Sequence, residues 1–238
     1  MSTTAGSDLP PMPYGVRLPR SRRWPVVLRA GALVMRPLHR RDEVQWLALR
    51  DKDWGWLGPW ESTRPPGSAE VVPSFAHMVA RDRRRARAGL ALPWALCWDG
   101  GWQDAPHPRP SRLPVVGGLT VSPIVWGSVM SASVGYWVGA DHAGRGMAPT
   151  ALALASDYLF RVMGLHRVEV CVRPENERSL RVVAKLAMTE EGLRREYLHI
   201  DGQWRDHRVF RLLADDLPAG VLAHYLDDHV LPGSGLSR

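Results

Sequence analysis

One segment constrains the fold of this chain most: residues 134–151 (VGYWVGADHAGRGMAPTA) read as a strand, a glycine-containing loop and the start of a helix. The strand is predicted to end at Gly139. Pro149 suits the first turn of the helix, because its fixed φ matches a helix start and its missing N–H is not needed there. The fold must therefore place a helix N-terminus just beyond the end of a strand.

The glycines of this loop predict an anion site. Gly144 and Gly146 lack a Cβ, so the backbone can approach a ligand closely and adopt unusual dihedral angles. The first amides of a helix have no intrahelical partner, and with the helix dipole they attract anions. We predict that a pyrophosphate binds the amides of the loop and that the arginine side chain within it adds charge. These loop residues are Gly144, Arg145, Gly146, Met147 and Ala148.

Two well-known phosphate loops do not fit, and a plain strand–helix turn stays open at this point. The lysine of a P-loop is missing, since no GK[ST] follows the glycines. A dinucleotide fingerprint would need a third small residue where Pro149 stands, and its carboxylate about 20 residues further on is not obvious. The loop alone therefore does not identify its ligand, and a second motif is needed.

The second motif lies on the next predicted helix, in residues 172–188 (VRPENERSLRVVAKLAM). Asn176 and Ser179 form an N-x-x-S pair there. The ordered combination of glycine loop and N-x-x-S helix resembles the acyl-CoA-binding motifs of the GNAT superfamily of N-acetyltransferases. The loop departs from the family pattern at Ala143, where relatives carry glutamine or arginine. The alanine side chain cannot make the contact that glutamine or arginine would make, but the main-chain amides of the loop can still bind the pyrophosphate.

The resemblance covers about residues 26–213 and narrows to the RimJ/RimL subfamily. Residues 34–49, 56–63 and 191–194 look like that subfamily, as do Gly202 and Asp206. Its members acetylate N-termini of ribosomal proteins, and some act on small amines. The resemblance implies a GNAT-type α+β fold: a mixed, mostly antiparallel sheet, splayed between its central parallel strands and flanked by helices.

Sequence patterns along the chain also predict one α+β domain with a mostly antiparallel sheet. Predicted strands cover 26–36 (interrupted near Gly31), 90–98, 115–122, 131–139, 165–172, 189–200 and 204–213. Predicted helices cover 42–51, 68–88 (capped by Ser68), 149–163, 176–188 and 215–231. The Trp/Gly/Pro-rich stretch 54–66 argues against a helix or a central strand. Residues 1–23 are expected to be a flexible basic arm, and 24–238 one domain ending in a helix.

The resemblance implies where the cosubstrate acetyl-CoA binds. Its pantetheine arm would lie between strands 131–139 and 165–172, bonded by the backbone of Tyr136, Trp137 and Val138. Because that role belongs to the backbone, a simply packed strand would carry the same side chains.

Two side chains of the N-x-x-S motif have implied roles as well. Asn176 would contact the pantetheine arm, a role compatible with capping its own helix. The Ser179 hydroxyl would lie near the sulfur and protonate or hydrogen-bond the thiolate. The alternative is that Ser179 is only a residue of the first helical turn.

A general base would be expected on the strand after Glu191, where some relatives carry a glutamate. Counting without gaps puts Leu198 at that place. Glu196 lies two residues earlier, on the same strand face, and is the candidate base if the strand is shifted or bulged. An exposed carboxylate is the alternative. An enzyme that acetylates an α-amine can work without a general base. Deprotonating an α-ammonium group with a pKa near ~7.8 costs roughly 0.7 kcal/mol at about pH 7.4, whereas deprotonating a lysine costs roughly 4 kcal/mol.

Three residues of the Trp/Gly/Pro-rich stretch are candidates for binding the acceptor. Trp56 and Trp60 would wall a peptide groove, or would pack against the core. Glu61 is the carboxylate best placed to attract a cationic N-terminus, unless it is a solvated loop charge.

Composition excludes several other classes of protein. With only Cys97 and Cys171, the chain cannot be a disulfide scaffold or a four-cysteine zinc module. Nine histidines show no metal-ligand spacing, so no metal is expected. No signal peptide or membrane span is evident, which predicts a cytoplasmic protein without a membrane partner. Residues 81–87 (RDRRRAR) form either the solvent-exposed face of a helix or a docking site for an acidic partner or ribosomal RNA.

The leading prediction is an enzyme that transfers acetyl directly from acetyl-CoA to the N-terminal α-amine of a protein, with a ribosomal protein as one candidate. Direct transfer is preferred because no cysteine lies in the acetyl-CoA motifs; Cys171, on the neighbouring strand, is the exception to check. Two alternatives stay open. One is acetylation of a small amine or antibiotic, and the other is a module that binds CoA without turnover.

Overall fold

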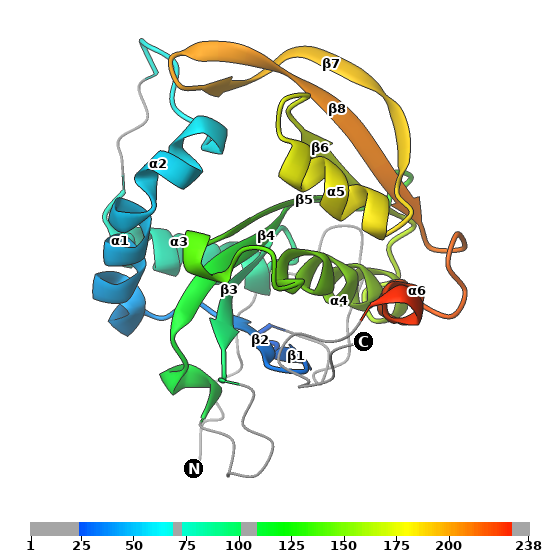
Figure 1. The fold of residues 1–238 in the computed structure, drawn as a ribbon, viewed down its shortest axis with the longest axis horizontal. Coiled ribbons are helices and arrows are strands. Elements are labelled where there is room, and N and C mark those ends of the chain that lie inside the picture. Colours follow the sequence, from blue (N-terminus) through cyan, green and yellow to red (C-terminus); the bar gives the residue numbers. More distant parts are fainter. Residues whose placement is uncertain (1–23, 69–72, 101–108, 230–238) are drawn as a thin grey trace, which may run out of the picture.

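The computed structural model describes residues 24–68, 73–100 and 109–229, and an eight-stranded sheet runs through them (Figure 1). The strand order is β1-β2-β3-β4-β5-β6-β8-β7, and every neighbouring pair is antiparallel except β5 and β6. The predicted arm 1–23 lies outside the described residues. The strands are β1 (Leu28–Ala30), β2 (Leu33–Pro37), β3 (Leu92–Trp98), β4 (Val115–Val125), β5 (Ser131–Val138), β6 (Arg167–Val172), β7 (Thr189–Ile200) and β8 (Gln203–Leu213).

Helices cover both faces of the sheet, because alternate residues of the central strands point to opposite sides. On β2, Leu33 and Met35 join one core cluster with α4, α5 and α6, whereas Val34 joins a second cluster with α1 and α3. Figure 1 shows the long β7–β8 hairpin curving past α5. The helices are α1 (Glu43–Lys52), α2 (Trp54–Leu57), α3 (Phe75–Arg87), α4 (Met147–Arg161), α5 (Glu177–Lys185) and α6 (Val221–Asp228).

The central parallel strands separate, as predicted. The β5–β6 ladder has three pairs, from Ser131 opposite Arg167 to Ser133 opposite Glu169. Beyond these pairs, residues 134–138 of β5 do not pair with residues 170–172 of β6. Each strand stays paired on its other side, β5 with β4 and β6 with β8. The backbone groups that face this gap are therefore available to a ligand. This splay confirms the predicted mostly antiparallel α+β sheet with a parallel pair in its middle.

The structure corrects three of the predicted secondary-structure assignments, two of them between residues 54 and 88 and one at the last helix. The stretch predicted to be non-helical contains α2 and a 3-10 turn, Gly58–Trp60, in which Pro59 sits in the first turn, where its missing N–H is tolerated. α3 is capped by Ser74 and not by Ser68: the Ser74 side chain accepts from the His77 amide at 3.3 Å.

The last helix is also shorter than predicted, since it begins at Val221 after a turn that contains Pro218 and Gly220. Asp157 of α4 fixes this start, because its carboxylate accepts from the Val221 amide at 2.8 Å and the Leu222 amide at 3.1 Å. Within the described ranges, no helix is both long and apolar enough to cross a membrane.

Candidate active site

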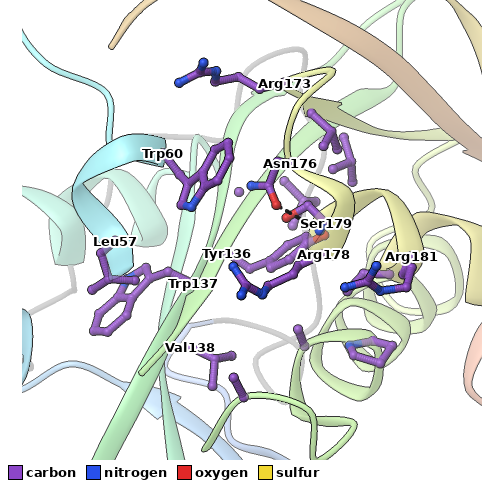
Figure 2. Close-up of a pocket in the computed structure, with 18 of the residues that line it drawn as sticks. Leu57, Trp60, Tyr136, Trp137, Val138, Arg173, Asn176, Arg178, Ser179 and Arg181 are labelled. Atoms are coloured by element: carbon purple, nitrogen blue, oxygen red, sulfur yellow. Dashed lines mark hydrogen bonds between the residues drawn. The ribbon is translucent and has the colours of Figure 1, made fainter. Parts of the chain in front are cut away.

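A cleft of about 590 Å³ occupies the gap between the splayed strands. Its walls come from β5, β6, α5, the start of α4 and the α2 segment, with β7 and β8 closing one side. Figure 2 shows Tyr136, Asn176 and Ser179 pointing toward one another inside it. The cleft is lined by all of the predicted site residues except two, Arg145 and Glu196.

The glycine loop has the backbone conformation that an anion cradle requires. Gly144 and Gly146 both adopt positive φ, 79° and 75°, which costs an L-residue about 1–2 kcal/mol. Gly146 is the N-cap of α4, so Met147 and Ala148 carry amides without an intrahelical partner at the cleft. Arg145 is exposed and is not among the lining residues. The loop therefore offers main-chain donors at the end of β5, and a role for Arg145 stays a prediction.

The N-x-x-S motif is built as the sequence suggests. The Asn176 side chain caps α5 by accepting a hydrogen bond from the Ser179 amide at 3.0 Å. The exposed helix face that follows brings Arg178, Arg181 and Lys185 to the cleft. Because these residues recur at helical spacing, their charges fall along one face of α5. Together with the glycine loop they make this end of the cleft suited to phosphate groups.

A pair of hydroxyl groups faces the middle of the cleft. The Tyr136 hydroxyl oxygen is buried and has no hydrogen-bond partner of ordinary geometry. Burial raises the pKa of Tyr136 to about 12, and the nearby Ser179 hydroxyl opposes that shift. Tyr136 is therefore a neutral phenol at physiological pH. A buried polar group without a partner is costly, which suggests that a ligand completes its hydrogen bonding.

Trp56 and Trp60 form the wall opposite α5. The Trp56 indole N–H donates to the Val138 carbonyl oxygen at 3.0 Å, and the Arg178 guanidinium lies 4.2 Å from the Trp56 ring centroid. The Arg173 guanidinium lies 5.3 Å from the centroid of Trp60. Trp56 of α2 and Trp60 of the following 3-10 turn thus contact other walls of the cleft.

Glu61 lines the cleft but is already paired. Its carboxylate oxygen lies 2.7 Å from a guanidinium nitrogen of Arg50, and its side chain keeps 34% exposure. Among the described residues that line the cleft, Glu61 is the only carboxylate. The cleft is therefore rich in positive charge.

The hairpin places Leu198 and Glu196 differently from the predicted alternation. A bulge between Arg194 and Leu198 shifts the register of β7, and Glu196 within it has a φ of 47°. Leu198 lines the cleft, whereas Glu196 is exposed and its amide donates to Asp206 Oδ1 at 2.8 Å. The expectation that both share one strand face is wrong, because the bulge inserts extra residues into one strand. Catalysis by Glu196 stays a prediction without support from the cleft geometry.

Several lining residues could not be found from local patterns. Arg178 sits inside the N-x-x-S motif and could have been picked out from its helical position. His142 and His207 gave no signal, because nothing in their local sequence shows that they face a cleft. Burial lowers the pKa of both histidines. In the part of the chain that the structure describes, no group of three His, Cys, Asp or Glu side chains could hold a metal ion.

Comparisons with known proteins agree with this geometry. Residues 32–189 match the model of the acetyltransferase (GNAT) domain. The chain therefore belongs to the GNAT acetyltransferases. The [ribosomal protein uS5]-alanine N-acetyltransferase of Escherichia coli (strain K12) is 30% identical over 196 residues, which are 82% of this chain and 94% of that protein.

A solved structure supports the same subgroup. Mycobacterium smegmatis RimJ, in complex with CoA-disulfide, has a TM-score of 0.74 and 33% identity, over 87% of this chain and 97% of that one. The spermidine N(1)-acetyltransferase of E. coli (strain K12) is 31% identical over 99 residues, 41% of this chain and 48% of that protein. The chain is an acetyl-CoA-dependent N-acetyltransferase of the RimJ type. This assignment rejects the alternative of a CoA-binding module without turnover.

Proposed function

We propose that this enzyme transfers the acetyl group of acetyl-CoA directly to the N-terminal α-amine of a protein, and that a ribosomal protein is its acceptor. The observation that carries the proposal is the acceptor side of the cleft, where one carboxylate, Glu61, accompanies two tryptophans. A cationic terminus would share Glu61 with Arg50, so the acceptor side suits no more than a single positive charge, and the tryptophan walls suit an extended peptide. The name of the E. coli relative supports the same acceptor class.

The residues present fit acetyl-CoA. The amides of residues 144–148 and the cationic face of α5 would hold its phosphates, and the unpaired backbone of β5 would bond the pantetheine arm. The amine nitrogen attacks the thioester carbon, the N–C bond forms and the C–S bond breaks. The proton that the amine loses passes to water in the cleft, and the leaving thiolate takes a proton from the hydroxyl of Ser179 or Tyr136, which solvent then reprotonates.

Transfer without an acetyl-enzyme is supported by the state of Cys171. This thiol lines the cleft, and Arg194 lies 3.5 Å from its sulfur. Burial raises the pKa of Cys171 despite that guanidinium, so the neutral thiol dominates at physiological pH. A neutral thiol is a poor nucleophile. The expected result is that Cys171→Ser keeps its turnover and that the intact mass of the enzyme with acetyl-CoA shows no acetyl adduct.

A second candidate acceptor is a small amine such as a polyamine, which the match to the E. coli spermidine enzyme favours. The charge of the cleft argues against it. On the acceptor side, Arg173 lies over the ring of Trp60, and the one lining carboxylate among the described residues, Glu61, is already paired with Arg50. A polycation would therefore find no unpaired negative charge there, whereas a peptide terminus brings only one positive charge.

A panel of acceptors tests the proposal. Purified enzyme and acetyl-CoA are incubated with alanine-initiated peptides, with the same peptides blocked at the N-terminus but carrying lysine, and with spermidine and aminoglycosides. We expect turnover on free N-termini only. Turnover on small amines alone would reject the proposed acceptor. Mass spectrometry of ribosomal-protein N-termini, in cells with and without the enzyme, then identifies the physiological acceptor.

A ribosomal acceptor would place the reaction in the cytoplasm. The arginine-rich surface of α3 is a candidate for approaching such a partner, since cationic patches speed encounters with acidic surfaces. Arg85 of this helix already donates to Ser122 Oγ at 2.9 Å, so not every arginine is available. Contact with RNA stays a prediction.

A further inference from the structure

His207 is a buried titratable group that no step of the reaction above employs. It lies on β8, is 3% exposed, and nonetheless lines the cleft. Leu198 and Ile200 of the neighbouring strand β7 also line the cleft, and Ile200 forms a β-bridge with Ser62, just beyond the tryptophan wall. His207 therefore belongs to the side of the cleft that would receive the acceptor.

The hydrogen bonding of His207 determines its tautomer. Its Nδ1 lies 3.0 Å from the Arg205 carbonyl oxygen. A carbonyl oxygen can only accept, so Nδ1 carries the proton and donates it. In the neutral ring, Nε2 is then the nitrogen with a lone pair. The backbone of the same strand thus holds the imidazole in the form that can accept a proton.

The surroundings keep this ring neutral. Burial is the main cause that lowers the pKa of His207 below its ordinary 6.5, and the positive charge of Arg173 lowers it further. The bond to Arg205 and the carboxylates of Glu175 and Asp206 oppose the shift. The Tyr197 ring packs edge-on against the imidazole, with 5.6 Å between the ring centroids. At physiological pH most of the enzyme therefore carries an imidazole with a free lone pair.

We propose that His207 is the general base of the acetyl transfer, its Nε2 accepting the proton of the acceptor amine directly or through one water. The inference rests on the proposed function for the nature of the amine. As the N–C bond forms, the proton moves from the amine nitrogen to Nε2 and the electrons of the C–S bond leave with sulfur. The imidazolium then returns the proton to solvent, or to the thiolate through a hydroxyl of the cleft.

Two other candidates fit less well. Glu196 is exposed on the β7 bulge and does not line the cleft. His142 lines it, but belongs to the 3-10 turn Ala140–His142 beside the glycine loop, at the phosphate end. His207 combines a place on the acceptor side with a fixed tautomer.

His207→Asn is the sharpest test, because the asparagine amide can still donate to the Arg205 carbonyl but offers no basic nitrogen. The matched control is His199→Asn. His199 is also buried, its Nδ1 lies 2.8 Å from Thr63 Oγ1, and it does not line the cleft. Folding is verified by circular dichroism. We expect kcat for a peptide amine to fall about 100-fold in His207→Asn, with the KM for acetyl-CoA within about threefold of wild type.

The pH profile separates a base from a structural residue. In the wild type, kcat/KM should rise with pH through two ionisations, the imidazole below 6.5 and then the amine. A base acts only when unprotonated, so activity is lost as pH falls through the imidazole's pKa. His207→Asn should lose the lower ionisation, and His199→Asn and Glu196→Gln should keep it. Near-wild-type kcat and both ionisations in folded His207→Asn would overturn the proposal.

The remaining outcomes are also decisive. If His207→Asn does not fold, the wild type and His142→Asn decide, because His142 also lines the cleft. A lower ionisation that persists in His142→Asn supports His207, and its loss there, or its absence from the wild type, rejects the proposal. If the wild type acetylates a small amine and no peptide, the proposed acceptor is wrong, and the same comparison on that amine still tests His207. A wild type that acetylates no amine would overturn both proposals.

Discussion

The indole N–H of Trp56 donates to the carbonyl oxygen of Val138 at 3.0 Å, and this bond joins the acceptor wall to the strand that would bind pantetheine. A second link lies close by, since the Ala140 amide donates to the Asp53 carboxylate at 2.7 Å. The short helix α2 is thereby held against the end of β5. Under the proposed function, the position of the acceptor would thus be coupled to that of the thioester.

Trp56→Phe should weaken acceptor binding more than acetyl-CoA binding. The phenyl ring keeps most of the wall but leaves the Val138 carbonyl without its donor, a loss of about 1 kcal/mol, or roughly fivefold in affinity. Steady-state kinetics should show a higher KM for the peptide. Trp54→Phe is the control, because Trp54 lies on the same helix, is 54% exposed and is outside the cleft. Equal effects of the two variants would refute the link.

Gly146→Ala should weaken CoA binding about tenfold. The residue has a φ of 75°, and an added Cβ would lie 3.0 Å from the Tyr225 hydroxyl. The strain of about 1–2 kcal/mol would disturb the amide cradle. Gly164→Ala is matched, with the same φ and open space around its Cβ position, away from the cleft. Calorimetric titration with CoA should distinguish them; unchanged affinity in Gly146→Ala would count against the cradle.

Tyr136→Phe should lower kcat without destabilising the free enzyme. The buried hydroxyl has no hydrogen-bond partner of ordinary geometry, so its removal relieves a poorly paired polar group. If that hydroxyl stabilises the leaving thiolate, turnover should fall about tenfold while the midpoint of urea unfolding stays or rises. Ser179→Ala, measured alongside, identifies which hydroxyl matters more. Unchanged turnover in both variants would remove these hydroxyls from the reaction.

Asp42→Asn should destabilise the fold strongly. The Arg36 guanidinium, 1% exposed, pairs with both oxygens of Asp42 at 2.7 and 2.9 Å. Removing one partner leaves a buried charge unpaired, at a cost of about 3–5 kcal/mol. Urea unfolding followed by circular dichroism measures it, with exposed Asp51→Asn as the control. A loss below about 1 kcal/mol would show that the pair is not buried in solution.

Native thiol labelling should select Cys171 over Cys97. Burial raises the pKa of Cys97 to about 12, and the residue lies outside the cleft. Cys171 is half-buried and faces the cleft, so CoA should slow its labelling. Labelling rises with pH as the thiolate forms. Mass spectrometry of alkylated peptides with and without CoA gives both rates; faster labelling of Cys97 would contradict the packing of β3.

Local patterns predicted the strands and most helices, because alternation and capping residues act over a few positions. They failed for α2, a short helix in a Gly/Pro-rich stretch, whose Trp56 is held by a hydrogen bond to Val138 of β5. They failed again at Glu196, because a bulge in the β7–β8 ladder breaks the alternation of side chains between the two faces of β7.

By itself the sequence predicted the loop and the helix that form the proposed cosubstrate half of the site, through motifs that resemble those of a known family. Gly146 and Asn176 act through backbone geometry and a helix cap within a few residues of themselves, so their spacing carries the information. Only the tertiary structure decided the acceptor half. His207 and Trp56 are 151 positions apart in this numbering. The pairing of β8 with β6 and β7 brings His207 to the cleft, and the bond from Trp56 to Val138 brings the tryptophan to it.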